Sequence, residues 1–325
     1  MDNVEIIPSL QEAIWNMNPD DKIALVLPGG GANGRYQFGG IWYTYKIGLL
    51  NRVNMVFGTS VGGLNALITA KYKNDLVKGY NMWENIEKNS DIYDGDLRFN
   101  NIIDWLGKAK QIFIDNKGKS ILKPTGLYKL LERELGGLTL KDLQMPTYIS
   151  ATNVTDKRME CFNSIMNPDF NCATLGKMTS AIPIIFPSVK YEDKSYKNFA
   201  VDGGIGRNNP VELAIRAGAN KIILIGTYPD QHERKIITDS IFDTGIATLE
   251  TIMAVFEEFA WDEIDDYNKL YEFDPKHFPK VKFLTLYPKK SGETLNFANK
   301  WQMQQGIDDA IDQWTMDKVT DFLAA

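Results

Sequence analysis

The chain has 325 residues, 44% of them hydrophobic and 24% charged, which is typical of a globular protein with a large buried core and not of a disordered one. Its net charge of −6 and the absence of a block of Lys and Arg argue against a nucleic-acid partner, because binding to phosphates depends on clustered positive charge. The acidic start of the chain is unlike a secretory signal, and no stretch approaches the roughly 18 apolar residues that span a bilayer. We therefore expect a cytoplasmic protein with at most peripheral membrane contact, and export without a cleaved signal stays open.

The first predicted elements form a β-α-β unit. Residues 23–27 are an unbroken apolar run that ends at a proline and a glycine cluster, as a strand buried on both faces does. A helix is predicted from Arg35 to about Asn51, a second strand over residues 53–57, and a second helix after Ser60. This order predicts an α/β protein with a mostly parallel sheet.

The rest of the chain extends this core. Residues 74–135 are expected to form a mostly helical, cap-like insertion. Further strands are predicted at residues 147–151, 159–162, 199–201, 222–226 and 281–286, and amphipathic helices over 242–260 and near the C-terminus. We expect one elaborated core over residues 1–230 and a helical C-terminal extension, residues 231–325, packed on it.

The two cysteines give no sign of a metal site. Cys161 and Cys172 have neither a CxxC spacing nor a neighbouring histidine cluster, so neither a metal nor an obligatory disulfide is expected. No motif requires another cofactor, and none is predicted.

A G-x-S-x-G motif, Gly58 to Gly62, lies between the second strand and the second helix. A turn that exposes the Ser60 hydroxyl must be sharp, and a Cβ at Gly58 or Gly62 would collide with neighbouring backbone. The helix that begins here adds a dipole that favours developing negative charge. The plainer alternative is a glycine-rich turn whose serine caps the helix.

A glycine-rich loop follows the first strand and comprises Gly29, Gly30, Gly31, Ala32, Asn33 and Gly34. Closely spaced backbone N–H groups can converge there on an anion, either a dinucleotide phosphate or an oxyanion. A dinucleotide site would need an acidic residue about 20 positions later, to bind the ribose, and no Asp or Glu occurs between Asp21 and Asp75. The sequence therefore argues against a dinucleotide site in this loop.

The third candidate is Asp202, which ends a strand-like stretch and precedes Gly203 and Gly204. An acid at this point can reach a site at the edge of the sheet. By itself an Asp-Gly pair more often forms a turn or caps a helix, so the weight of this motif comes from its combination with the other two.

The three motifs together closely resemble the patatin-like phospholipase family over roughly residues 22–228. The similarity includes the segments 180–183 and 186–187 before the Asp-Gly-Gly motif and 209–211 after it. The resemblance implies a three-layer α/β/α fold, phospholipid or lysophospholipid substrates, Ser60 as nucleophile and Asp202 as base. It also implies that the loop from Gly29 to Gly34 is the oxyanion hole. The family often has a basic residue where this chain has Asn33, which leaves Arg35 as the candidate for contact with a lipid head group.

The remaining alternatives differ in mechanism. The chain has two histidines, His232 and His277, and the order Ser60, Asp202, His is that of an α/β-hydrolase triad. That fold has several strands before its nucleophile, whereas only one strand clearly precedes Ser60, so we expect Asp202 to take the serine proton directly. Acyl transfer through the same dyad and a non-catalytic binding role stay open.

Overall fold

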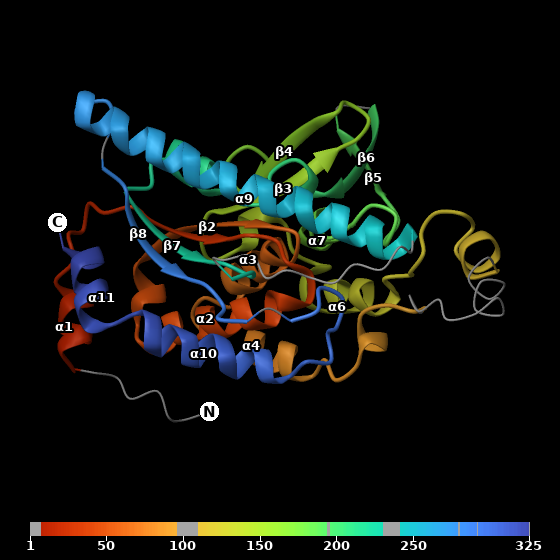
Figure 1. Ribbon diagram of the computed structural model, residues 1–325, viewed down its shortest axis with the longest axis horizontal. Helices are drawn as coiled ribbons and strands as arrows, with labels where there is room; N and C mark the ends of the chain where they lie inside the picture. The colour runs from red at the N-terminus through yellow and green to blue at the C-terminus, as the bar shows by residue number, and fades with distance from the viewer. Residues whose placement is uncertain are drawn as a thin grey trace.

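One mixed sheet covered by helices on both faces organises the protein (Figure 1). The computed structural model describes residues 8–95, 110–193, 196–229, 241–278, 280–290 and 292–324. The sheet order is β5-β6-β3-β2-β1-β7-β8, and β4 pairs with β3 as well. The strands are β1 (Ile23–Leu27), β2 (Val53–Thr59), β3 (Thr147–Asn153), β4 (Arg158–Asn163), β5 (Val189–Asp193), β6 (Tyr196–Asp202), β7 (Lys221–Ile225) and β8 (Lys282–Leu286).

The centre of the sheet is parallel and one end is antiparallel. Strands β8, β7, β1, β2 and β3 all run the same way, as the β-α-β pattern predicts. Strands β4 and β6 run antiparallel to β3, and β5 runs antiparallel to β6. The predicted strands are therefore confirmed, and β5 is an additional one.

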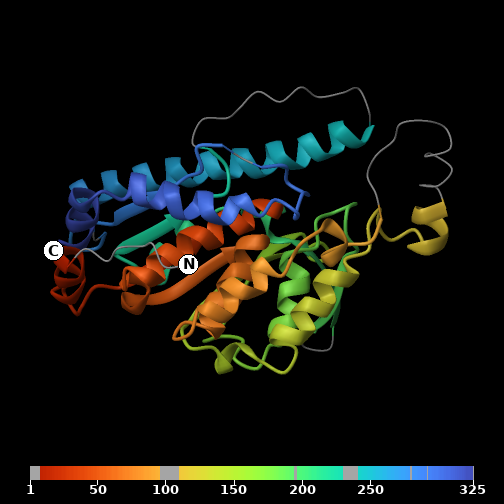
Figure 2. The same ribbon diagram turned by 90° about the horizontal axis from the view of Figure 1, so that it is seen from below.

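The helices form a layer on each face. They are α1 (Pro8–Trp15), α2 (Gly34–Lys46), α3 (Val61–Lys71), α4 (Val77–Glu84), α6 (Thr125–Leu135), α7 (Cys172–Thr179), α8 (Val211–Arg216), α9 (Ile241–Phe273), α10 (Trp301–Gln313) and α11 (Met316–Leu323). Figure 2 shows the long cyan helix α9 on one side of the molecule and the yellow-green helices on the opposite side.

The side chains of β1 alternate between the two faces of the sheet, which explains why helices cover both faces. Leu25 and its neighbours at two-residue spacing belong to the larger core cluster, together with residues of α2, α3, α7 and α10. Ala24 and Val26 point to the other side, where they pack with residues of α8 and with Ile264 of α9. A strand that is fully buried on both faces has no polar side, which is why its sequence is an unbroken apolar run.

Two helices differ from their predicted bounds. The helix expected to reach Asn51 ends at Lys46, because Gly48 takes a left-handed conformation (φ 85°) that stops it, and a short 3-10 turn, Leu49–Arg52, follows. The second is the helix predicted from apolar positions at 242–260 with an acidic end from Asp262. It ends at Phe273, and Ile264 in its acidic part is buried against the sheet.

The C-terminal part of the chain is built into the core. Strand β8 extends the sheet by pairing in parallel with β7, and α10 packs along α2. Helices α1 and α11 lie side by side, near the C-terminus of the chain in Figure 1. The domain boundary at residue 230 stays a prediction, and it falls in residues 230–240, which lie outside the described residues. Among the described helices, none is long and apolar enough to cross a membrane.

Candidate active site

Ser60 lies in a strained turn between β2 and α3. Its backbone has φ 55° and ψ −129°, a region that non-glycine residues seldom adopt, and its side chain does not cap the helix. A Cβ on Gly58 would overlap the carbonyl oxygen of Gly62, and a Cβ on Gly62 would overlap that of Leu27. The predicted steric need for glycine at both positions is thus confirmed. The alternative, in which the Ser60 side chain caps the helix, is not observed.

The register of the sheet brings Asp202 to this turn. Strand β2 ends with Thr59 opposite Ser150 of β3, and it runs parallel to β3. Strand β6 runs in the opposite direction and ends with Asp202 opposite Ala151, the next residue of β3. Because β4 occupies the other edge of β3, β2 and β6 meet end to end along the same edge. Two motifs 142 residues apart therefore converge at one point.

The two side chains are in direct contact. Ser60 Oγ donates to Asp202 Oδ2 at 2.6 Å, and the second carboxylate oxygen, Oδ1, accepts from the N–H of Gly204 at 2.8 Å. Ser60 and Asp202 are only 3% and 2% exposed. Burial raises the pKa of Asp202 to about 7, although the two hydrogen bonds oppose this shift by stabilising the ionised form. A carboxylate with such a pKa can exchange a proton near neutrality.

A threonine that the sequence does not single out supports the serine. The N–H of Ser60 donates to Thr179 Oγ1 at 2.9 Å, and the Thr179 hydroxyl donates to the carbonyl of Ser150 at 2.7 Å. The segment after Thr179 also holds Asp202, because the N–H of Asp202 donates to the carbonyl of Ala181 at 2.9 Å. Thr179 is the last residue of α7. In the sequence, its role is indicated only by its position directly before residues 180–183, which resemble the family.

The glycine loop lies beside the serine, but only part of it is free to bind an anion. The N–H of Ala32 donates to Thr294 O, that of Asn33 to Gly30 O, and that of Gly34 to carbonyls within the loop. In the part of the chain that the structure describes, the N–H groups of Gly29, Gly30 and Gly31 have no such acceptor. Among the six predicted residues, these three therefore keep a free N–H group, and Gly31 lines the same cavity as Ser60.

Arg35 does not point toward the site. Its Nη2 donates to the carbonyls of Trp83 at 2.5 Å and Ile86 at 2.6 Å, and the side chain is 1% exposed. Its guanidinium also lies 6.0 Å from the centre of the Trp83 ring. The contact with a lipid head group that the sequence suggests has no support in this geometry, because the guanidinium joins α2 to α4 and to the segment that follows α4.

An apolar cavity opens from Ser60. Val61, Leu64 and Ile68, on one face of α3, carry the cavity about 10 Å along that helix, since each residue advances the axis by about 1.5 Å. The remaining lining residues are Gly31, Ser60, Met82, Trp83, Ile86, Ile92, Leu127, Leu130, Leu131, Glu134, Ser180, Ile182, Phe186 and Phe297. Most of the wall thus comes from α3 and from the insertion at residues 74–135, which contains α4 and α6.

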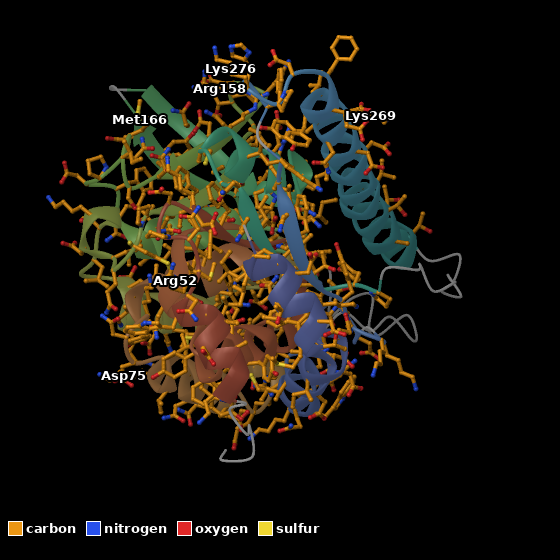
Figure 3. All side chains as sticks on the ribbon, turned by 90° about the vertical axis from the view of Figure 1, so that its left-hand side faces the viewer. Arg52, Asp75, Arg158, Met166, Lys269 and Lys276 are labelled. Atoms are coloured by element: carbon orange, nitrogen blue, oxygen red, sulfur yellow. The ribbon has the colours of Figure 1, made fainter. Side chains whose placement is uncertain are left out.

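Among the residues that the structure describes, no histidine contacts Ser60 or Asp202. His277 lies on the surface beyond α9, where its side chain is 68% exposed and its Nδ1 lies 2.7 Å from Asp274 Oδ2. Its neighbour in the chain, Lys276, lies at the outer surface in Figure 3. His232 lies outside the described residues. The direct contact between Ser60 and Asp202 leaves no space for an imidazole between the two side chains.

The chain is similar to known proteins in sequence and in fold. The family model of patatin-like phospholipases matches residues 25–215. The "Probable lipid hydrolase 463L" of Invertebrate iridescent virus 6 is 26% identical over 213 residues, which are 62% of this chain and 66% of the viral protein. Human GIVD cytosolic phospholipase A2 has a TM-score of 0.52 at 10% identity, with 97% of this chain and 62% of that chain covered. VipD from Legionella pneumophila has a TM-score of 0.44 at 14% identity, with 94% and 67% covered.

The similarity to the human structure is a similarity of fold. The family match covers most of the strands of the sheet and includes both Ser60 and Asp202. This chain spans less than two thirds of the human enzyme and about two thirds of the viral protein. Since the family model covers more than half of the chain, the protein belongs to the patatin-like phospholipase family.

Proposed function

We propose that the protein is a lipid acyl hydrolase of the phospholipase A or lysophospholipase type, with Ser60 as nucleophile and Asp202 as its only base. The observation that carries this proposal is the 2.6 Å hydrogen bond from Ser60 Oγ to Asp202 Oδ2 in a buried site. A serine hydroxyl becomes a useful nucleophile only when a positioned base accepts its proton. Asp202 is the group that accepts from it.

In the first half of the reaction, Ser60 Oγ attacks the ester carbonyl carbon while its proton passes to Asp202 Oδ2. The carbonyl oxygen becomes an oxyanion, for which the N–H groups of Gly29, Gly30 and Gly31 are the free donors of the loop. Each such donor contributes about 3 kcal/mol to transition-state stabilisation in serine hydrolases. The protonated Asp202 then gives its proton to the leaving alcohol, and the fatty acyl group remains bound to Ser60 as an ester.

In the second half, water replaces the alcohol. Asp202 takes a proton from the water as it attacks the acyl-serine carbonyl, and returns the proton to Ser60 Oγ when the bond to the enzyme breaks. The products are the free fatty acid and the regenerated serine. The pKa of Asp202, raised by burial to about 7, suits both directions of proton transfer.

The cavity supports a fatty-acyl substrate. Its walls are almost entirely aliphatic and aromatic, and it begins at the serine, so an acyl chain in it would present its ester carbonyl to Ser60 Oγ. Phospholipids and lysophospholipids provide such esters. The head group is to be identified by the experiment below. Arg35, the one basic residue that the sequence suggests for binding it, is buried elsewhere.

The proposal is tested by incubating the purified protein with a mixed lipid extract and identifying the products by mass spectrometry. Wild type should release free fatty acids, and Ser60→Ala should release none while it keeps the fold. Ser180→Ala is a matched control, since Ser180 also lines the cavity but donates to the carbonyl of Gly176 at 2.7 Å. Hydrolysis by folded Ser60→Ala would exclude the proposed nucleophile, and acyl transfer to an added alcohol would indicate a transferase.

A further inference from the structure

We infer that three residues of the C-terminal part of the chain, Gly292, Thr294 and Gln302, hold the glycine loop in its anion-binding conformation. We call them the C-terminal clamp. Among them Gln302 acts through its side chain and is a positioning residue for Gly30 and Gly31. This inference rests on the proposed function, because it assigns those two glycines to the oxyanion hole.

The clamp contacts the two residues that follow Gly31. Thr294 O accepts from the N–H of Ala32 at 2.7 Å. Asn33 Oδ1 accepts two hydrogen bonds, from the N–H of Gly292 at 3.0 Å and from Gln302 Nε2 at 2.8 Å. Asn33 and Gln302 are each 1% exposed, so these bonds are shielded from water.

The side chain of Asn33 is therefore used for the clamp and not for its own helix. Asn33 occupies the N-cap position of α2, where an asparagine usually accepts from a helical N–H, yet it makes no such bond. A buried amide oxygen that lost its donors would carry a desolvation cost, so this pairing gives the loop one preferred position.

Gln302 is held in place by a close crossing of two helices. A Cβ on Gly306 of α10 would overlap the carbonyl oxygen of Tyr36, and a Cβ on Gly39 of α2 would overlap that of Met303. The two backbones are thus in contact, and Gln302 lies about one helical turn before Gly306. Since α2 begins directly after the loop, this crossing fixes Gln302 relative to Asn33.

The loop is fixed from its other end by residues of the core. Thr227 Oγ1 donates to the carbonyl of Gly29 at 2.6 Å, and Gln37 Nε2 donates to that of Pro28 at 3.0 Å. The backbone between these anchors and the clamp contains Gly30 and Gly31. Gly31 has φ 56°, and a Cβ on it would overlap Thr294 O, so the clamp also limits this position to glycine.

The clamp lies beyond residue 215, where the family match ends. Loss of one of its hydrogen bonds should let the loop leave its productive position without emptying the acyl cavity. The expected result is a lower kcat with a nearly unchanged KM, because the oxyanion donors act mainly on the transition state.

The test compares Gln302→Met with Gln304→Met. Methionine has a similar length but no donor, and Gln304 is an exposed residue of the same helix whose Nε2 donates to Asp308 Oδ1 at 2.8 Å. Amide hydrogen exchange of a peptide covering residues 28–34 and steady-state kinetics on a nitrophenyl ester are measured for both. We expect Gln302→Met to exchange faster in this peptide and to lose about tenfold or more in kcat, with KM within about twofold, whereas Gln304→Met should match wild type.

Hydrogen exchange separates this inference from the proposed function, because it needs no activity. Unchanged exchange in residues 28–34 of Gln302→Met would overturn the clamp, whether or not the protein hydrolyses esters. Faster exchange with unchanged kcat would also overturn the positioning role. If Gln302→Met fails to fold, Gln302→Asn provides the same test, because its amide is one methylene too short for the 2.8 Å bond. An inactive wild type would count against the proposed function alone.

Discussion

Asp202→Asn should abolish activity and, at the same time, stabilise the protein at neutral and alkaline pH. Asp202 is 2% exposed, and burial raises the pKa of its carboxyl group to about 7, whereas an unfolded Asp has a pKa of about 3.9. An asparagine can keep both existing contacts: its Oδ1 can accept from Gly204 N–H and its Nδ2 can donate to Ser60 Oγ. The substitution thus removes the charge and retains the shape.

The size of the effect follows from the difference between the two pKa values. Between about pH 4 and pH 7 the folded state binds more protons at Asp202 than the unfolded state does, so the wild-type stability falls as pH rises. A difference of about 3 units at about 1.4 kcal/mol each sets a ceiling of about 4 kcal/mol, reached above about pH 7. Below about pH 4 Asp202 is protonated in both states and the advantage of asparagine vanishes. We expect an increase of at least about 2 kcal/mol at pH 8, and little change near pH 4.

The measurement is urea unfolding followed by circular dichroism at pH 5 and pH 8. Wild type and Asp202→Asn are compared with Asp20→Asn, which changes an exposed aspartate. The free energy of unfolding should rise for Asp202→Asn at pH 8, by clearly less at pH 5, and hardly at all for the control. A variant that is equally stable or less stable than wild type at pH 8 would refute the argument that Asp202 bears a cost of burial.

Three further predictions concern catalysis. Because Asp202 must be ionised to accept a proton, kcat/KM should rise about tenfold per pH unit below pH 7 and level off above it; a flat profile from pH 5 to pH 8 would contradict its role as base. Gly31→Ala should lower kcat about a hundredfold, since its Cβ would meet Thr294 O, whereas Gly118→Ala, also at positive φ but with open space around it, should keep full activity; equal kcat values would argue against the oxyanion assignment. Leu131→Trp should fill part of the cavity and slow hydrolysis of a long-chain ester more than that of an acetyl ester; equal losses on both esters would place the acyl chain elsewhere.

Ser60 and Asp202 could be singled out in the sequence because each of their motifs has a local cause. An apolar run, a G-x-S-x-G turn and a strand that ends in Asp-Gly-Gly are all visible within a few residues. The distance between Ser60 and Asp202 depends instead on the pairing of β2 and β6 along one edge of β3. That register is a property of the assembled sheet, which is why only the resemblance to a family could join the two motifs in advance.

The free N–H groups of the glycine loop, by contrast, could not be predicted from the sequence. All six residues look equally suitable in sequence, because backbone donors leave no trace in side-chain identity. Which N–H groups stay free depends on Thr294, whose carbonyl takes the Ala32 donor, and on contacts within the loop itself. Residue 294 follows Gly31 by more than 250 positions, so no local pattern could reveal the contact.

The burial of Arg35 away from the site could not be predicted for a related reason. A lone basic residue beside a motif can bind a ligand or satisfy buried carbonyls, and the sequence does not distinguish these roles. Here the carbonyls of Trp83 and Ile86 come from the insertion, whose path over the core could not be predicted from its irregular pattern.

The most direct test of the proposed mechanism is the activity of a protein without histidines. Turnover of a short-chain nitrophenyl ester by His232→Ala/His277→Ala is compared with that of Asp202→Asn and Ser60→Ala, with folding checked by circular dichroism. The dyad predicts that the histidine-free protein stays within about threefold of wild type, a barrier change of less than about 0.7 kcal/mol, while Asp202→Asn falls to the level of Ser60→Ala. A loss of about a thousandfold or more in the folded histidine-free protein would contradict it and require a triad.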